Sequence, residues 1–441
     1  MNTKLIGLSI LLIAISVAPI PVVAQESRIV LTNANVINCT GTGEPLQEDM
    51  TIVITGNRIT SIAKAGTIAI PVRGTRSIDV NGGYVVPGFW NMHSHLSDLL
   101  PDVNDMLEGE AVLPAAIRAG RNAMDGIKRG FTSLRMTGEI HYIDVAWRDA
   151  FDAGVFVGPR IFASGKIVMS RGNGGWPVDI QISGPEEARK ATQENIDKGA
   201  DFIKIVAPSL QQDEMEAVIE VAHANGLRVT AHSGGDVARR AIEAGVDCIE
   251  HGGGISDETI ALMAEKGTFL DPTVVCNLSA EYIAERERLI AEVIEDQDPE
   301  VVAGRILVAQ ADQRSPETAQ NYRDIITKAQ AAGVQIITGG DSSPVGEIGL
   351  LEIEQMAFSG LTELQALIAG TRNCADMVGR LDDLGTIDEG KLADLLVLEA
   401  NPLDHISNIR KLKMVFKDGL PVNLGKNEGQ ASFWELYFTE K

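Results

Sequence analysis

The sequence predicts an α/β protein: a (β/α)₈ barrel of the TIM type with a small β-sandwich domain formed by the N- and C-terminal segments. Two observations support this fold class. The middle of the 441-residue chain alternates short apolar strand candidates with amphipathic helix candidates, whereas both ends are rich in short β-patterns. The expected boundaries are a signal peptide at 1–24, the sandwich at 25–86 and 376–441, and the barrel at 87–375.

The first 24 residues have the pattern of a secretory signal peptide. Lys4 gives a positive start, residues 5–23 carry no charge, and small residues up to Ala24 offer a cleavage site. An uncleaved anchor is the alternative, because the apolar run approaches the ~20 residues that span a membrane. Pro19 and Pro21 disfavour a continuous helix there. We therefore expect a periplasmic or secreted protein with no membrane attachment after cleavage.

The predicted sandwich draws on strand candidates at both ends of the chain. They are residues 28–31, 51–54 and 58–62 near the N-terminus, and 393–398 and 414–416 near the C-terminus. A hairpin-type connection, Thr55-Gly56-Asn57-Arg58, joins two of the first group. Because two β-rich ends flank a middle of different character, we expect the terminal segments to pair with each other.

Eight strand candidates alternate with helix candidates over roughly 250 residues, the usual length of a (β/α)₈ barrel. The strand candidates are 84–92, 131–134, 160–163, 202–206, 228–231, 247–250, 268–271 and 335–338, and the helix candidates include 185–198, 213–225 and 257–266. A doubly wound sheet is the alternative. It is disfavoured because no GxGxxG or P-loop fingerprint follows a strand candidate.

Residues 277–332 interrupt the alternation with a long, charged helical insert that includes 281–295 and 299–311. In a barrel this insert follows the seventh strand and precedes the eighth, so it lies at the side or the lid of the active site. A plain solvated helical pair is the alternative.

Charge and cysteine content exclude some classes of function. The chain has 38 Lys and Arg against 61 Asp and Glu, a net charge of −23, which argues against a nucleic-acid partner because phosphate would be repelled. The four cysteines, at 39, 248, 276 and 374, form no CxxC pair. Buried free thiols and a Cys248–Cys276 bridge both remain open.

Histidine is scarce, with seven in the chain, and four histidines lie at the carboxyl ends of strand candidates. Active sites of barrels form at that face. His93 and His95 are two residues apart on one strand, so both imidazoles point to one side and can reach one ion. His232 and His251 each end a strand candidate, and Asp341 follows the apolar stretch 335–338, where it can bind a cation and handle protons.

Lys204 lies within the apolar strand candidate 202–206, where an uncompensated charge is costly to bury. A salt-bridged or snorkelling lysine is one interpretation. The other is a lysine whose amine has taken up carbon dioxide to become an anionic carbamate that can bridge two divalent cations. Because the lysine, the four histidines and Asp341 all lie at or near strand ends, the set predicts a metal site.

With this set the chain resembles the amidohydrolase superfamily, in particular its binuclear branch of imidazolonepropionase-like proteins and prolidase-type metallo-dipeptidases. The matching residues are Pro87-Gly88-Phe89, His93-Ser94-His95, Gly158-Pro159-Arg160, Lys204, His232, Glu250-His251-Gly252, Asp341 and the stretch 384–395. The resemblance covers nearly the whole mature chain. It implies a barrel with a terminal sandwich.

The resemblance also implies two divalent metal ions, usually zinc. His93 and His95 would bind one ion with Asp341, His232 and His251 would bind the other, and N-carboxylated Lys204 would bridge them. A hydroxide between the ions would attack the substrate, and Asp341 would pass its proton to the leaving nitrogen.

The chain departs from its relatives at positions that contact substrate. Relatives often carry a histidine in a Gly-Gly-His-Gly loop after the third strand, where this chain has Asn173-Gly174. They also tend to have an aromatic residue after the histidine of the fifth strand, where this chain has Ser233-Gly234-Gly235. Candidate substrate contacts here are His141, Tyr142, Arg171, Asn173 and Trp176. A packed surface loop is the alternative for 170–177.

The sequence therefore predicts an exported metal-dependent hydrolase that cleaves an amide bond of a dipeptide or of an N-acyl or aryl-amide amino acid. A cyclic amide or lactone hydrolase of the same superfamily is one alternative, and a metal-free binding protein on the same fold is another. The ligand types also suit manganese or cobalt. The expected partner is a small-molecule or dipeptide substrate, and a homo-oligomer is possible.

Overall fold

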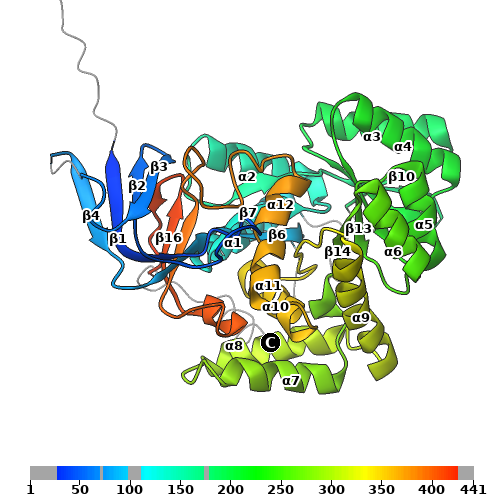
Figure 1. The fold of residues 1–441 in the computed structure, drawn as a ribbon. Coiled ribbons are helices and arrows are strands. Elements are labelled where there is room, and N and C mark those ends of the chain that lie inside the picture. Colours follow the sequence, from blue (N-terminus) through cyan, green and yellow to red (C-terminus); the bar gives the residue numbers. More distant parts are fainter. Residues whose placement is uncertain (1–26, 70–72, 98–110, 173–177, 426–441) are drawn as a thin grey trace, which may run out of the picture.

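The computed structural model describes residues 27–69, 73–97, 111–172 and 178–425 (Figure 1). The predicted signal peptide and two of the candidate substrate contacts, Asn173 and Trp176, lie outside the described residues. Within the described part of the chain, every helix is too short or too polar to cross a membrane.

Strands from the two ends of the chain form one eight-stranded sheet, at the left of Figure 1. Its strands are β1 (Arg28–Val36), β2 (Gln47–Thr55), β3 (Arg58–Lys64), β4 (Thr75–Asp79), β5 (Tyr84–Pro87), β15 (Leu395–Leu398), β16 (Leu412–Lys417) and β17 (Leu420–Pro421). The order is β17-β16-β15-β5-β1-β2-β3, and β4 pairs with β1. The ends meet where β5 pairs antiparallel with β15, with Val86 opposite Leu396.

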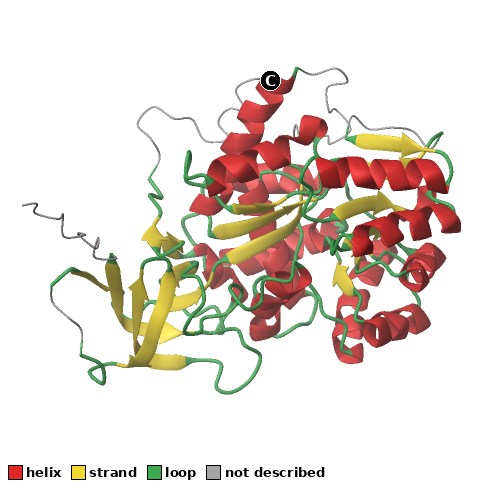
Figure 2. Ribbon diagram, turned by 90° about the horizontal axis from the view of Figure 1, so that it is seen from above, coloured by secondary structure: helices red, strands yellow, loops and turns green. Residues whose placement is uncertain are grey.

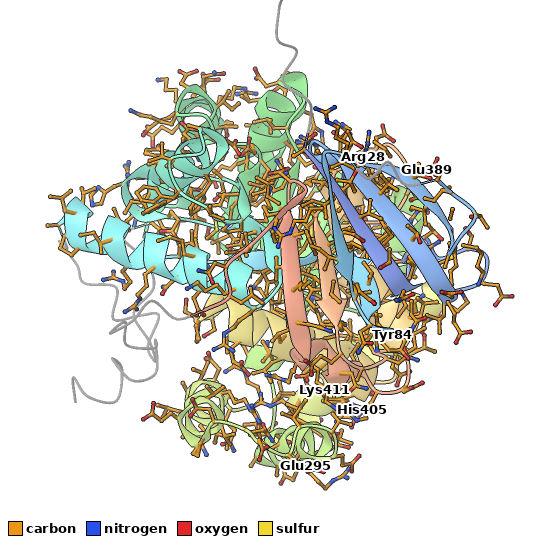
Figure 3. All side chains as sticks on the ribbon, turned by 90° about the vertical axis from the view of Figure 1, so that its left-hand side faces the viewer. Arg28, Tyr84, Glu295, Glu389, His405 and Lys411 are labelled. Atoms are coloured by element: carbon orange, nitrogen blue, oxygen red, sulfur yellow. The ribbon has the colours of Figure 1, made fainter. Side chains whose placement is uncertain are left out.

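The expected pairing of the terminal segments is therefore confirmed, while a second sandwich layer stays a prediction. Apolar side chains on one face of this sheet, including Leu31, Ile52, Val397 and Phe416, share a separate hydrophobic core. In Figure 3 the molecule is turned so that the left-hand side of Figure 1 faces the viewer. Arg28 then lies toward one end of the sheet, and Tyr84 and Lys411 lie toward the other.

The middle of the chain is a TIM-barrel-like arrangement of parallel strands. A three-stranded sheet has the order β6-β7-β8, and a six-stranded sheet has the order β10-β9-β11-β12-β13-β14. The strands are β6 (Phe89–Ser94), β7 (Phe131–Met136), β8 (Arg160–Phe162), β9 (Ile167–Ser170), β10 (Asp179–Ile182), β11 (Ile203–Val206), β12 (Val229–Ser233), β13 (Cys248–His251) and β14 (Phe269–Asp271). Seven of the eight strand candidates in this region are strands in the structure, whereas β9 and β10 were not predicted.

The eighth strand candidate, residues 335–338, is a correction. The segment was predicted to be a strand, but it forms only one isolated parallel bridge, between Ile336 and Leu270. Its backbone still links the two sheets, because Ile337 N–H donates to Leu270 of β14 at 2.9 Å and Met92 N–H of β6 donates to Thr338 at 2.8 Å. The segment thus occupies the position of an eighth strand without a continuous ladder.

Helices cover the outside of these strands (Figures 1 and 2). They are α1 (Val112–Lys128), α2 (Ile143–Asp152), α3 (Pro185–Asp197), α4 (Gln212–Ala224), α5 (Gly235–Ala244), α6 (Asp257–Lys266), α10 (Val345–Phe358), α11 (Glu363–Ala369) and α12 (Arg372–Met377). Short 3₁₀ turns are η2 (Ile140–Tyr142), η3 (Ala207–Ser209), η4 (Val274–Cys276) and η5 (Ile406–Arg410). The sequence sets several starts: Pro185 opens α3, Gln211 and Glu214 form a capping box on α4, and the Ser256 side chain caps α6.

The predicted insert consists of three helices: α7 (Ala280–Ala291), α8 (Pro299–Ala311) and α9 (Pro316–Ala332). Each begins at a side-chain cap, from Ser279, Asp298 and Ser315 respectively. The alternative of a helical pair is wrong, because α9 follows α8 and contacts α6. The turns before and between these helices bring the insert to the edge of the central cavity.

Candidate metal centre

The six predicted metal-site residues lie around one cavity of about 420 Å³. They come from different strands or strand ends of the barrel-like region, and all are at least partly buried. They are His93 of β6, His95 just after it, Lys204 of β11, His232 of β12, His251 at the end of β13, and Asp341 after the 335–338 segment. The structure therefore brings together residues that are up to 248 positions apart (341 − 93) in the sequence.

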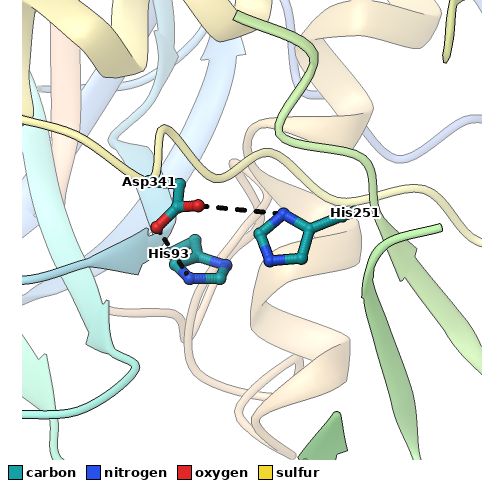
Figure 4. Close-up of side chains that lie close together, drawn as sticks. All are labelled: His93, His251 and Asp341. Atoms are coloured by element: carbon teal, nitrogen blue, oxygen red, sulfur yellow. Dashed lines mark ion pairs between the residues drawn. The ribbon is translucent and has the colours of Figure 1, made fainter. Parts of the chain in front are cut away.

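Asp341 lies between three of the imidazoles. Its Oδ1 is 3.1 Å from His93 Nε2 and 3.5 Å from His95 Nε2, and its Oδ2 is 3.8 Å from His251 Nδ1 (Figure 4). The ring centroids of His232 and His251 are 4.4 Å apart. Burial alone would raise the pKa of the Asp341 carboxyl, but these histidines hold it well below its usual value. Asp341 is therefore an ionised carboxylate at neutral pH.

The donor set fits divalent metal. Ligand atoms of His93, His251 and Asp341 lie within 4.8 Å of one another, and imidazole and carboxylate are common ligands of divalent ions. The Nζ of Lys204 is buried and has no hydrogen-bond partner in the described part of the chain. Burial also lowers the pKa of this amine below its usual value. An orphaned, buried amine beside this cluster lacks a structural explanation of its own.

The tautomers of three histidines are set by partners behind them. His93 Nδ1 is 2.7 Å from Glu250 Oε2, His95 Nδ1 is 2.8 Å from the carbonyl of Gly138, and His251 Nδ1 is 2.7 Å from Thr273 Oγ1. When Nδ1–H donates to such an acceptor, Nε2 is left with its lone pair for a metal ion. The three Nε2 atoms are thus the expected ligand atoms.

Glu250, which contacts His93, belongs to a buried network of charged side chains. Arg135 Nη2 donates to Glu250 Oε1 at 2.6 Å and to Asp271 Oδ2 at 3.2 Å, and its Nε donates to the Met92 carbonyl. All three charged side chains are fully buried. Burial raises the pKa of Glu250, but the charges of Arg135, Lys204 and His93 outweigh it, so this carboxylate stays ionised. Burial and the charge of Glu250 raise the pKa of Asp271 well above its usual value.

Glu250 and Asp271 also approach His93 closely enough to suggest a second metal position. Arg135 already pairs with both carboxylates, so we interpret this group as support for His93. This network was missed in the sequence, although its signal was present. Arg135 and Glu250 are charged residues inside apolar strands, the same signal that identified Lys204.

Three site residues have left-handed backbone conformations that L-residues rarely adopt. The φ angles are 70° at His251, 44° at Thr273 and 48° at Asp341. Such a conformation costs of order 1–3 kcal/mol per residue and persists only where the surroundings impose it. Their grouping at one cavity is typical of a functional site.

The other described substrate-contact candidates lie away from the cavity. His141 and Tyr142 are in η2, where the Tyr142 hydroxyl donates to Glu194 Oε1 at 2.9 Å. The exposed Arg171 pairs with Glu187 at 3.4 Å. None of the three is among the described residues that line the cavity. All four cysteines are free and buried, so the interpretation as buried thiols is confirmed and a Cys248–Cys276 bridge is not formed.

The remaining cavity walls were not predicted. One wall is apolar and comprises Ile167, Val178, Val206 and Pro208. The helical insert and the turn before it supply Cys276, Asn277, Asp312, Arg314 and Tyr322. The one signal in the sequence is the charged stretch Asp312-Gln313-Arg314 directly after the helix candidate 299–311, and it gives no direction for the side chains.

Comparisons with known proteins agree with this geometry. Residues 84–422 match the amidohydrolase family. Ochratoxinase of Aspergillus niger is 28% identical over 438 residues, covering 89% of this chain and 85% of that protein. The structure of a Xaa-Pro dipeptidase with bound methionine in the active site superimposes with a TM-score of 0.75 at 30% identity, covering 90% of this chain and all of that one. A prolidase complexed with N-methylphosphonate-L-proline gives 0.73 at 29% identity, covering 90% and 99%.

Proposed function

Because the chain belongs to the amidohydrolase family and is a hydrolase of carbon–nitrogen bonds, we propose that it cleaves the amide bond of a dipeptide or of an N-acyl or aryl-amide amino acid. The proposal rests on one observation: His93, His95, Lys204, His232, His251 and Asp341 converge on a single cavity. The similarity to proteins named as a Xaa-Pro dipeptidase and a prolidase supports a dipeptide substrate. The similarity to a protein named ochratoxinase supports keeping other amides among the candidate substrates.

Two divalent ions, with zinc the first choice, would be held by this cluster. His93, His95 and Asp341 would hold one and His232 and His251 the other, with the carbamate of Lys204 shared between them. The buried, partnerless amine of Lys204, whose pKa burial lowers, supports the carbamate, because only an unprotonated amine adds to carbon dioxide. When bound, such ions lower the pKa of a water and polarise the scissile carbonyl.

In this proposal Asp341 transfers the proton, and Glu250 orients the His93 imidazole. The Asp341 carboxylate accepts a proton from the attacking water and donates it to the nitrogen of the leaving amine, which leaves poorly unless protonated. His93, His95 and His251 keep this carboxylate ionised and ready to accept. Glu250 fixes His93 from behind, so that Nε2 faces Asp341.

The test is amine release by the mature protein, loaded with zinc, from a panel of dipeptides, N-acyl amino acids and lactones. We expect hydrolysis of an acyclic amide subset, loss of it after chelation, and its return on adding metal. The K204A variant should be inactive, whereas K328A, at an exposed lysine of α9, should match the wild type. Hydrolysis of lactones alone would favour the cyclic-substrate alternative, and no turnover with metal bound would contradict the proposal.

A further inference from the structure

The cavity has two chemically different walls beside the histidine cluster. The apolar wall has no charged side chain, whereas the polar wall contains Asn277, Asp312, Arg314 and Tyr322. Arg314 is the one arginine among the described residues that line the cavity, and Lys204 is the one lysine. Because Lys204 is buried beside the metal cluster, Arg314 is the cation that an incoming substrate meets.

Arg314 is anchored along one edge and open along the other. Its Nε donates to Asn277 Oδ1 at 3.0 Å, and its backbone N–H donates to the Leu278 carbonyl at 2.9 Å. Its Nη2 forms an ion pair with Asp312 Oδ1 at 3.9 Å, a separation that is beyond hydrogen-bond distance. Within the described residues the two Nη nitrogens thus donate to no acceptor. A guanidinium held in this way presents two parallel N–H groups, the geometry that binds a carboxylate.

Tyr322 of α9 lines the same cavity as Arg314 and Asp341. The Tyr322 hydroxyl lies against Gly253, because a Cβ added to this glycine would be 2.4 Å from the hydroxyl oxygen. Gly253 lies two residues after His251 in the chain. No described group accepts from or donates to this hydroxyl. The charges of both Arg314 and Asp341 act on Tyr322, so it lies within electrostatic reach of both. Cys276, which also lines the cavity, lies close to Asp341. Its thiol donates to the carbonyl of Gly340, the residue before Asp341, at 3.1 Å.

We propose that Arg314 binds the free α-carboxylate on the leaving side of the scissile amide, with the Tyr322 hydroxyl as a second donor. The substrate class is then amides whose leaving group is an amino acid with an unblocked carboxylate, and the apolar wall takes the acyl side chain. A local cation is needed for such an anionic substrate, because the chain has a net charge of −23. This inference rests on the proposed function.

The experiment compares matched substrates that differ only at the carboxyl end. Each dipeptide or N-acyl amino acid that the zinc-loaded enzyme cleaves is assayed beside its C-terminal carboxamide, with wild type, R314Q, R314K and R288Q. A charge-assisted contact predicts that the wild type prefers the free acid by roughly 10- to 100-fold in kcat/KM. R314Q should lose this preference, mainly through a higher KM for the free acid. R314K should keep part of it, and R288Q, at an exposed arginine of α7, should keep all of it.

A binding measurement decides the proposal independently of turnover. Calorimetry with L-leucine and L-leucinamide should show that the wild type prefers the acid and that R314Q does not. Equal use and equal binding of acid and carboxamide by the wild type would overturn the carboxylate site while leaving amide hydrolysis intact. An unchanged acid preference in R314Q would overturn it too. Absence of any amide hydrolysis would instead refute the proposed function, and the binding comparison would still decide the role of Arg314.

Discussion

Asp341 is the residue at which the site's electrostatics and its chemistry meet. It is ionised, it is close to three imidazoles, and its backbone has an unfavourable φ that its surroundings maintain. Replacing it with asparagine keeps the shape and removes both the charge and the proton acceptor. We expect D341N to fold normally and to lose about 10²- to 10⁴-fold in kcat, the usual contribution of a general base.

The measurement for D341N is steady-state hydrolysis together with circular dichroism and metal content. The matched control is D257N, because Asp257 is an exposed carboxylate at the start of α6. Loss of kcat with metal retained identifies proton transfer, whereas loss of metal identifies ligation as the main role. A D341N variant that hydrolyses substrate at the rate of the wild type would show that Asp341 is not the base.

Single residues were predictable where they break a strand pattern. His93 and Lys204 are polar or charged within apolar strands, His95 directly follows one, and the structure places all three at the cavity. Tyr142 was misjudged because nearness to a strand end does not fix direction. It has a φ of 57°, and its hydroxyl meets Glu194 of α3. Arg314 was missed because only the packing of three helices decides which way a turn between them faces.

At the scale of elements, α10 shows how a helix is tied to its neighbours by buried charge. Its Glu347 is fully buried and contacts Arg410 at 2.6 Å, Arg129 at 3.0 Å and Arg305 at 3.8 Å. These arginines come from η5, from the end of α1 and from α8. Burial raises the pKa of Glu347, but the arginines outweigh it and lower the pKa from 4.5 to about 2.

This shift predicts acid sensitivity. A carboxyl whose pKa is lower in the folded than in the unfolded state stabilises the fold above its unfolded pKa, and this stability is lost as the pH falls through the folded pKa. Glu347 should therefore contribute about 3 kcal/mol above pH 4.5, which disappears toward pH 2. We expect E347Q to lower the free energy of unfolding at pH 7 by about 3–5 kcal/mol, because it leaves buried arginines unpaired.

Urea unfolding of E347Q at several pH values between 7 and 2 tests this, with E265Q, at an exposed position of α6, as control. E347Q should be less stable at pH 7 and should show a shallower dependence on pH below 4.5 than the wild type. An unfolding midpoint and a pH slope equal to those of E265Q would refute a stabilising role for this network.

Helices with marked starts were predictable, whereas the strands were predicted only in part. Helices α3, α4 and α6 match their predicted spans to within a residue or two, because proline, a capping box and a serine cap define their starts. Strands β9 and β10, with four residues each, were missed, although β8 and β14, with three residues each, were predicted. Residues 335–338 have the composition of a strand, but they form only one bridge because their neighbours determine the pairing.

For the whole molecule, the terminal sheet and the barrel-like region are connected through both sequence and packing. Only Gly88 separates β5 of the terminal sheet from β6, which holds His93. Its N–H donates to the Asp394 carbonyl at 2.9 Å, and a Cβ there would come within 2.0 Å of the Thr132 side chain. The β-rich ends predicted that the termini would pair. This close approach could not be predicted, because a glycine's neighbours across strands are known only from the fold.

Leu396 offers a test of whether the two regions unfold as one. It is fully buried in β15 opposite Val86, and it belongs to the same hydrophobic core as Phe89 and Phe131 of the barrel-like strands. Truncating a buried leucine to alanine costs about 2–5 kcal/mol. Because this core is shared, we expect L396A to shift a single calorimetric unfolding transition down by several degrees.

The control L420A changes a largely exposed leucine of β17 and should leave the transition in place. If L396A instead resolves two transitions and lowers only one, the terminal sheet is an independent folding unit and its packing does not stabilise the strands that hold the metal site.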